Sequence, residues 1–319
     1  MNLFPSSHPS STNLHRKKFV FAVLAEKSII EGLLGDNLTA HCGIALASFS
    51  TRLHYLGILP EQLKSLFPDM VLAIIAFAYT FDIANQAFSV EEDSINKPHR
   101  PIPSGQMSQE GAYIRWALSW SLFPTEICMT TGPVAATLLL SWEAWTFLFY
   151  VWPKFDNWVA RNAFTAVGAV IQLHLIDSVL AHHVPSFKNE SSLGYVIFSW
   201  LFMTIHVQEF HDMEGDRNTG RQTLPLLLSS RGRFWLRVGT AVMMVMAAVA
   251  SVTLTGHRCS SLHSVCFLGL CLLLSTSVLS MRLVVLRRKE ADKVTYKYFY
   301  FLATYIMLLF HAHIEARSG

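Results

Sequence analysis

The feature that most constrains this chain is a series of apolar runs, each close to the length needed to cross a lipid bilayer. A spanning helix needs roughly 20 mostly apolar residues. Nine runs approach that length: residues 38–58, 68–88, 110–130, 133–151, 162–181, 193–211, 235–255, 262–282 and 295–313. Only 15% of the 319 residues are charged, whereas a soluble domain carries about 25%. The sequence therefore predicts an all-α integral membrane bundle of about nine transmembrane helices.

The segment before the first apolar run has a different composition. Residues 1–16 are rich in Ser and Pro and lack the charged-then-apolar order of a signal peptide, so we expect a disordered tail. Residues 17–36 mix charged and apolar residues and are too broken to span. They favour an amphipathic helix at the membrane interface. Residues 37–315 are expected to form a single transmembrane domain.

Basic residues are concentrated on one side of the predicted bundle. Four precede the first span and sixteen lie on or near the even-numbered connections, whereas the other side has only Lys64, Lys188, Arg258 and Arg317. The positive-inside rule then places the N-terminus and the even connections in the cytosol. In a eukaryote, we expect this multi-pass protein in the endoplasmic reticulum membrane. The net charge of +3 is too small to indicate a nucleic-acid partner.

The most polar connection, residues 85–105, follows the second predicted span. It carries three consecutive acids and then two bases among prolines: Glu91, Glu92, Asp93, Lys97 and Arg100. Acids beside bases on a rigid proline frame are suited to hold a metal ion and an anion. For this loop alone, a solvated connection between helices is an equally good interpretation.

A second acidic cluster ends the sixth predicted span, four helices after the first and on the same predicted face. Asp212 and Asp216 are four residues apart, so both carboxylates face the same way on a continued helix, with Glu209 one turn earlier. Arg217 and Arg221 follow. Equivalent positions of the two clusters predict a tandem duplication of a four-helix unit, with one helix added.

Acids at these two places predict a magnesium site. Mg²⁺ prefers oxygen ligands and is usually held by one or two carboxylates together with substrate phosphates. The predicted metal ligands are Glu92, Asp93, Glu209, Asp212 and Asp216. The predicted partners of a diphosphate are Lys97, Arg100, Arg217 and Arg221.

These motifs resemble those of the UbiA superfamily of intramembrane prenyltransferases. The likeness lies in residues 85–105 and in Asp212-Met-Glu-Gly-Asp216, with a weaker match at Tyr150, Lys154, Asn162 and Gly168. The resemblance implies catalytic roles for Asp93, Asp212, Asp216 and Lys154. It implies substrate binding by Asn85, Lys97, Arg100, Asn162, Arg217 and Arg221. Ser89 and Glu209 stand where the family has aspartates, which leaves the number of metal ions open.

The resemblance also implies a reaction: Mg²⁺-assisted loss of diphosphate from an isoprenyl diphosphate, farnesyl or similar, to give an allylic cation. The second motif is closer to the fungal-type membrane-bound terpene cyclases, in which the prenyl chain cyclises on itself. The alternative is transfer to an aromatic acceptor, and a transporter is a third, more distant reading. Aromatic rings could stabilise the cation; the candidates are Trp116, Trp120, Trp142, Trp145, Phe147, Tyr150, Trp200 and Phe202.

Overall fold

The computed structural model describes residues 11–35, 38–56, 58, 60–155, 157–185, 187, 192–256 and 262–318, and the regular secondary structure of this part is helical, with one isolated β-bridge in the connections between helices. The longer helices are α1 (Ser11–Leu34), α2 (Leu38–Leu56), α3 (Pro60–Phe88), α5 (Gln109–Thr130), α6 (Pro133–Tyr150), α7 (Trp158–His183), α8 (Leu193–Thr204), α11 (Ser230–Gly256), α12 (Leu262–Val285) and α14 (Phe301–Ser318). The shorter segments are α4 (Val90–Asn96), η1 (Ile205–Gln208), α9 (Glu209–Asn218), α10 (Leu224–Leu227), α13 (Lys289–Val294) and η2 (Thr295–Tyr300).

Each apolar run predicted to span coincides with a helical segment, so the prediction of an all-α fold is confirmed. Four of the described helices are long and apolar enough to cross a membrane: α3, α7, residues Ser230–Leu254 of α11 and residues Val265–Val285 of α12. The sixth run is not one helix, because α8 ends at Thr204 and a 3₁₀ turn separates it from α9. The count of nine spans and the two-repeat organisation remain predictions.

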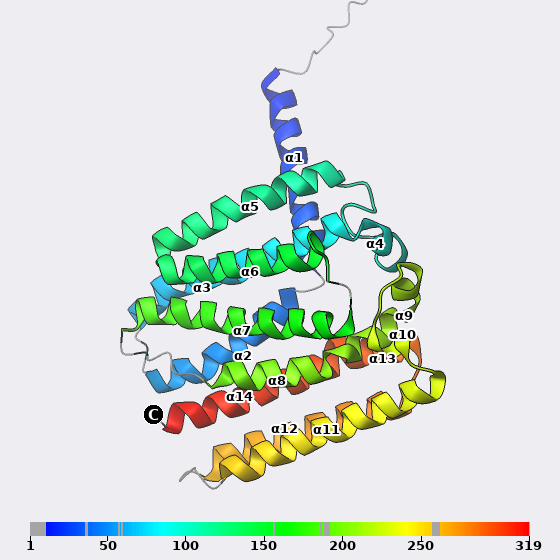
Figure 1. Ribbon diagram of the computed structural model, residues 1–319. Coiled ribbons are helices and arrows are strands. Elements are labelled where there is room, and N and C mark those ends of the chain that lie inside the picture. The colour runs from blue at the N-terminus through cyan, green and yellow to red at the C-terminus, as the bar shows by residue number, and fades with distance from the viewer. Residues whose placement is uncertain are drawn as a thin grey trace, which may run out of the picture.

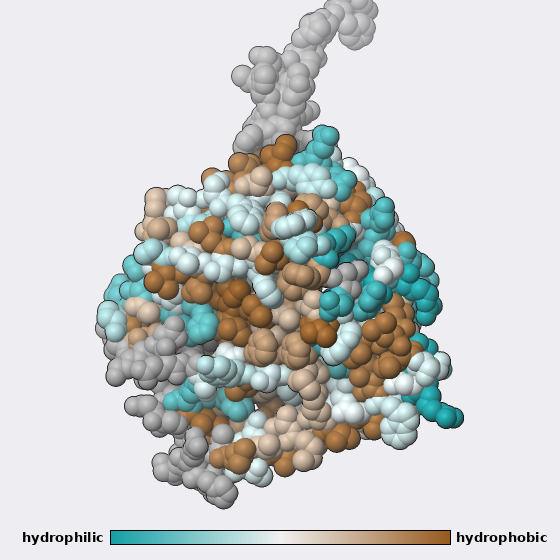
Figure 2. Space-filling model, in the orientation of Figure 1, coloured by the Kyte–Doolittle hydropathy of each residue, from teal (hydrophilic) through white to brown (hydrophobic). Residues whose placement is uncertain are grey.

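The long helices other than α1 lie side by side, α1 projects from the bundle, and the short helices α4, α9, α10 and α13 gather at one end (Figure 1). This is the end at which the predicted even-numbered connections emerge. Figure 2 shows hydrophilic residues along the same edge of the molecule. The short helices therefore form a polar end on an apolar bundle.

α1 begins at Ser11, and residues 1–10 lie outside the described part; the predicted tail of residues 1–16 and the interfacial role of residues 17–36 remain predictions. The last proline before the helix is Pro9, and nothing beyond it prevents the helix from starting at Ser11. The other end of α1 is attached to α3, where the Gln86 side chain donates to the Leu33 carbonyl at 3.2 Å.

The centre of the bundle, between α3, α6 and α7, is packed by aromatic rings. Trp142 stacks on Phe77 with ring centroids 4.4 Å apart, and its indole N–H donates to the Phe77 carbonyl at 2.9 Å. Gly168 of α7 provides the space for this indole, since a Cβ there would lie 2.5 Å from Trp142 Cζ3. The glycine is therefore required for close approach of α6 and α7 rather than for its backbone conformation.

Gly168→Ala tests this packing. The added methyl group must displace the Trp142 ring, and overpacking of this kind costs about 1–3 kcal/mol. We expect a lower apparent melting temperature (Tm) in detergent. Gly239→Ala is the matched control, because this helical glycine has no atom within 4 Å of an added Cβ. Its Tm should stay unchanged or rise, and an equal loss in both variants would contradict the proposed contact.

Candidate active site

The polar end brings together connections that are far apart in the sequence. The β-bridge between Asn157 and Gln222 joins the α6–α7 connection to the α9–α10 connection. On another side of α9, Lys289 of α13 contacts Glu214 at 2.8 Å. α4, which carries the first acidic motif, packs against α9, which carries the second, so the two motifs are neighbours in the structure.

The first motif folds as the short helix α4, which begins after a break at Ser89. Its first turn contains Glu91, Glu92 and Asp93, which suits the positive end of the helix dipole. Glu91 is exposed and Glu92 is half-buried, whereas Asp93 is only 3% exposed. The three acids therefore differ in environment, and Glu92 and Asp93 point away from solvent.

Asp93 and Arg100 form a buried pair. Arg100 Nη1 lies 2.9 and 2.8 Å from the two carboxylate oxygens of Asp93, and Arg100 is only 1% exposed. Both charges are out of water, so each requires the other, and removal of one partner of such a pair costs about 3–5 kcal/mol. In this structure the pair holds the proline-rich loop against α4. The predicted contacts of Asp93 with metal and of Arg100 with diphosphate remain predictions.

The second motif lies on the continuous helix α9, as predicted. Glu209 and Asp216 are buried, at 4% and 1% exposure, and Asp212 is partly exposed with an oxygen 3.4 Å from His211 Nε2. Gly215 allows the two motifs to approach, since a Cβ there would lie 1.8 Å from the amide nitrogen of Asn96 in α4. The glycine of Asp212-Met-Glu-Gly-Asp216 is thus a contact point with the first motif.

Arg221 joins the two motifs directly. Its Nη1 lies 2.7 Å from Glu92 Oε1 and 3.5 Å from Asp216 Oδ1. Burial raises the pKa of Glu92 and the pKa of Asp216, although Arg221 lowers both. Asp216 Oδ2 is buried and has no hydrogen-bond partner among the described residues. One oxygen at the centre of the site therefore lacks the partner that a buried charge needs.

Arg161 is a site residue that the sequence reasoning did not select. In the sequence it stands out only as one of the sixteen basic residues on or near the even-numbered connections. In the structure its Nε lies 3.2 Å from Glu209 Oε1, and the Leu224 backbone N–H donates to Glu209 Oε2 at 3.2 Å. Arg161 also interacts electrostatically with Asp216. Its position directly before Asn162, at the start of the fifth predicted span, is the signal that could have found it.

Other predicted residues lie away from this centre. Lys154 is exposed on the α6–α7 connection, with φ +63°. The Asn162 side chain is buried and donates to the Phe202 carbonyl at 2.8 Å, linking α7 to α8. Arg217 is exposed and lines a pocket that contains none of the five predicted metal ligands. Asp216 and Arg217 diverge because adjacent residues of a helix point in different directions.

The two remaining predicted substrate contacts, Asn85 and Lys97, are both half-buried. Asn85 lies in the last turn of α3, and Lys97 follows α4 within electrostatic range of His211. The structure thus places Lys97 beside the second motif, consistent with a shared site. The substrate contacts themselves remain predictions.

The residues fit a magnesium ion only in part. Among the described residues, no three His, Cys, Asp or Glu side chains are close enough to form a metal centre. The predicted five-acid set is not assembled, because arginines occupy Asp93, Glu92 and Glu209. The donors near the centre are nevertheless carboxylate oxygens, and Asp216 Oδ2 is unpartnered within the described chain. One or two such oxygens together with phosphates are the usual ligands of Mg²⁺.

Tyr150 connects the charged site to the aromatic core. It interacts electrostatically with Arg161, Arg221, Arg100 and Glu92. Ring contacts then run inward from Tyr150 to Phe81 at 5.7 Å and to Phe164 at 5.5 Å, and from Phe164 to Trp142 at 5.3 Å. We call these four residues, Tyr150, Phe81, Phe164 and Trp142, the aromatic column.

Other predicted aromatic candidates lie outside the aromatic column. Trp116 and Trp120 pack on Phe147 between α5 and α6. Trp200 donates to Thr304, and Phe202 stacks on Phe198. Trp145 donates to the Phe164 carbonyl at 3.2 Å. These contacts are those of ordinary helix packing, so Tyr150 and Trp142 are the predicted rings that belong to the aromatic column, and Tyr150 is the one beside the charged groups.

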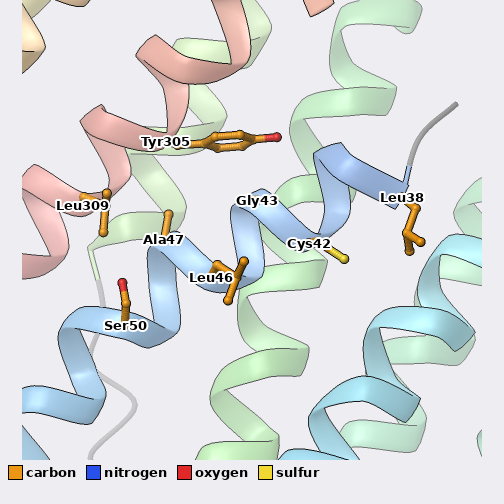
Figure 3. Close-up of a pocket in the computed structure, with 8 residues that line it drawn as sticks. All are labelled: Leu38, Cys42, Gly43, Leu46, Ala47, Ser50, Tyr305 and Leu309. Atoms are coloured by element: carbon orange, nitrogen blue, oxygen red, sulfur yellow. The ribbon is translucent and has the colours of Figure 1, made fainter. Parts of the chain in front are cut away.

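An apolar groove of about 560 Å³ lies elsewhere, between α2 and α14. Figure 3 shows Tyr305 extending across it, over the backbone of α2. Its lining residues are Leu38, Cys42, Gly43, Leu46, Ala47, Ser50, Tyr305 and Leu309. None of them is acidic or basic, so this groove is not suited to hold a diphosphate.

Comparison with known protein families matches residues 53–305 to the UbiA prenyltransferase family. The chain belongs to this family. Solved UbiA-fold structures agree: a UbiA homolog from Archaeoglobus fulgidus bound to GPP and Mg²⁺ superposes with TM-score 0.60 at 13% identity, covering 89% of this chain and 99% of that chain. A digeranylgeranylglyceryl phosphate synthase structure gives TM-score 0.56 at 19% identity, covering 91% and 99%.

Curated UbiA-type relatives include both cyclases and transferases. The diterpene cyclase eriG of Hericium erinaceus is 30% identical over 54% of this chain and 55% of its own length. The polyprenyl transferase eriF of the same fungus is 31% identical over 51% and 55%. Somaliensene A/B synthase of Streptomyces somaliensis is 29% identical over 81% and 82%. The chain thus spans about half the length of eriG and eriF in these matches.

The contact between α4 and α9 can be tested by Gly215→Ala. We expect a lower Tm, because the added methyl group clashes with the Asn96 amide and separates the two motifs. The double variant Asn96→Ala/Gly215→Ala removes the clashing amide and should recover part of the loss. A double variant no more stable than Gly215→Ala would contradict this contact.

Proposed function

We propose that this protein ionises an isoprenyl diphosphate, farnesyl or similar in length, and cyclises the resulting allylic cation to a terpene. The observation that carries the proposal is the position of Arg221 between Glu92 and Asp216, with Tyr150 connecting this charged site to the aromatic column. Groups suited to a diphosphate and groups suited to a carbocation are thus adjacent. The UbiA family and its terpene cyclase relatives support the same reaction.

The proposed reaction begins with heterolysis of the bond between the allylic carbon and the bridging oxygen. The bonding electron pair leaves with the diphosphate, and the carbon chain becomes a cation. A double bond of the same chain then attacks the cation to close a ring, and loss of a proton gives a neutral hydrocarbon. No acceptor or redox partner is needed.

Arg161 and Arg221 are the proposed diphosphate partners. A guanidinium offers two parallel N–H donors to phosphate oxygens. In the structure Arg161 pairs with Glu209, and Arg221 pairs with Glu92 and Asp216. The diphosphate therefore competes with carboxylates for the same guanidinium groups, and its binding leaves carboxylate oxygens in need of a cation.

We propose that Glu92 and Asp216 hold Mg²⁺, with Asp212 and Glu209 beside them. Asp216 Oδ2, which has no hydrogen-bond partner in the described part of the chain, supports this assignment, and a solved relative bound to GPP and Mg²⁺ supports the choice of ion. When bound, the metal supplies positive charge against the charge that develops on the leaving diphosphate.

The aromatic column is the proposed environment of the cation. The negative face of an aromatic ring attracts a cation, and the attraction is stronger where water is excluded. Phe164 and Trp142 are 8% and 2% exposed, so this part of the bundle is shielded from solvent. Tyr150 lies at the boundary, where the diphosphate and the cation separate.

The cyclase is proposed over the alternative, a transferase acting on an aromatic acceptor. Two relatives named as a diterpene cyclase and a somaliensene synthase support it, the second over 81% of this chain. The transferase eriF and the archaeal digeranylgeranylglyceryl phosphate synthases support the alternative. The likeness of the second motif to membrane-bound cyclases favours the first reading.

We further propose that the bundle crosses the membrane nine times as two four-helix repeats plus one helix, with its polar end in the cytosol. The gathering of the even-numbered connections at one end supports this arrangement (Figure 1). The excess of basic residues on these connections supports the orientation. In a eukaryotic cell, the membrane proposed for this protein is that of the endoplasmic reticulum.

Metal dependence is tested by diphosphate release from farnesyl and geranylgeranyl diphosphate in purified membranes. EDTA should abolish release and excess Mg²⁺ should restore it. Glu92→Gln and Asp216→Asn should each lower turnover by about 100-fold or more, the usual loss when one preorganised electrostatic group is removed. Glu91→Gln is the matched control: it changes the neighbouring exposed glutamate and should retain activity. Release that persists in EDTA would reject the metal role.

Product analysis separates the two enzyme readings. Incubation with prenyl diphosphates and no acceptor should give a cyclic hydrocarbon, detected by gas chromatography and mass spectrometry. Product that forms only after an aromatic acid is added would instead establish the transferase.

A further inference from the structure

A second charged pocket lies at the polar end, on the side of α9 away from the acidic site. It has a volume of about 560 Å³ and lies between α9, α11 and α13. Five basic residues line it, Arg217, Arg233, Arg237, Arg287 and Lys289, against two acidic ones, Glu214 and Asp292. The helices that form it thus present an excess of positive charge.

Both acids of this pocket are already paired. Asp292 accepts from Arg237 at 2.6 and 2.7 Å in a buried contact. Glu214 contacts Lys289 at 2.8 Å. Two basic residues are therefore neutralised within the pocket, and the remaining three, Arg217, Arg233 and Arg287, make up the excess positive charge.

The three remaining arginines differ in the contacts that orient their guanidinium groups. Arg233 donates to the Leu228 carbonyl at 3.1 Å and to Ser230 Oγ at 3.0 Å, so its guanidinium is fixed at the start of α11. The Arg287 guanidinium lies 5.3 Å from the centre of the Phe234 ring. Arg217 is exposed. A guanidinium that is already oriented loses less entropy when it binds an anion.

We propose that this basic pocket binds a phosphate-bearing anion. Guanidinium groups recognise phosphate oxygens in bidentate geometry. Basic pockets at the polar end of a membrane bundle are typical sites for anionic lipid headgroups. The sources that share this chemistry are a lipid phosphate monoester and free phosphate.

The pocket is lined by other residues than those of the proposed active site. Phe210, Met213 and Arg217 of α9 line the basic pocket, whereas Glu209 and Asp216 contact Arg161 and Arg221. The two sites border each other at His211, which lines the pocket and lies 3.4 Å from Asp212. The proposed anion therefore goes beyond the substrate diphosphate and its metal. The basic pocket would bind this anion whether or not the proposed reaction is correct.

Binding is measured with the full-length protein in detergent and EDTA, so that Mg²⁺-dependent binding at the active site does not contribute. The probes are dioctanoyl phosphatidic acid and inorganic phosphate, followed by native mass spectrometry and titration. Arg217→Gln and Arg287→Gln should each weaken binding by about tenfold, the loss expected for one charge-assisted contact. Arg231→Gln, an exposed arginine of the same helix end outside the pocket, should leave affinity unchanged.

The outcomes divide as follows. Binding of phosphatidic acid alone, with loss in both pocket variants, supports a lipid headgroup. Binding of inorganic phosphate with the same losses supports a free anion. No binding of either probe, or variants with unchanged affinity and unchanged Tm, overturns the proposal. Binding lost in Arg221→Gln but kept in Arg287→Gln would place the anion in the active site and also overturn it.

Discussion

The structure depends on the pairing of buried carboxylates with arginines at the polar end of an apolar bundle. A charge near the membrane interior is costly unless a partner neutralises it. Arg221 contacts Glu92 and one carboxylate oxygen of Asp216, and Arg161 contacts Glu209. The Arg221–Glu92 contact joins α4, in the first half of the chain, to the α9–α10 connection in the second half. The groups proposed to carry the chemistry of the site thus also hold its two acidic motifs together.

Two glycines set the distances on which this arrangement rests. Gly168 lets the Trp142 ring lie against α7, and Gly215 lets Asn96 lie against α9. The first contact closes the aromatic core, and the second closes the polar end above it. A small residue at each point is a steric requirement that neither hydrophobicity nor charge would reveal. At both points a side chain of one helix lies directly against the backbone of another helix at a glycine.

Much of the fold could be predicted because the length of an apolar run indicates whether it can form a helix that crosses a bilayer. The break at Thr204 could not, since a 3₁₀ turn leaves the hydrophobicity of the run unchanged. Residue type and spacing placed Glu92 and Asp216 in one region. They did not reveal that Asp93 is taken by Arg100, or that Arg161 reaches Glu209 across 48 positions. Such pairings depend on tertiary packing, which a single sequence does not display.

The position of α9 has a consequence for communication across the polar end. This helix of 10 residues is the common wall of two charged compartments. An anion in the basic pocket and a diphosphate on the other side would contact opposite faces of the same short rod. Any rotation or shift of the helix that one of them favours changes the affinity of the other. Thermodynamic linkage makes that influence reciprocal. An anionic lipid in the basic pocket would change the affinity of the active site for diphosphate, and bound diphosphate would change the affinity of the pocket for the lipid by the same factor.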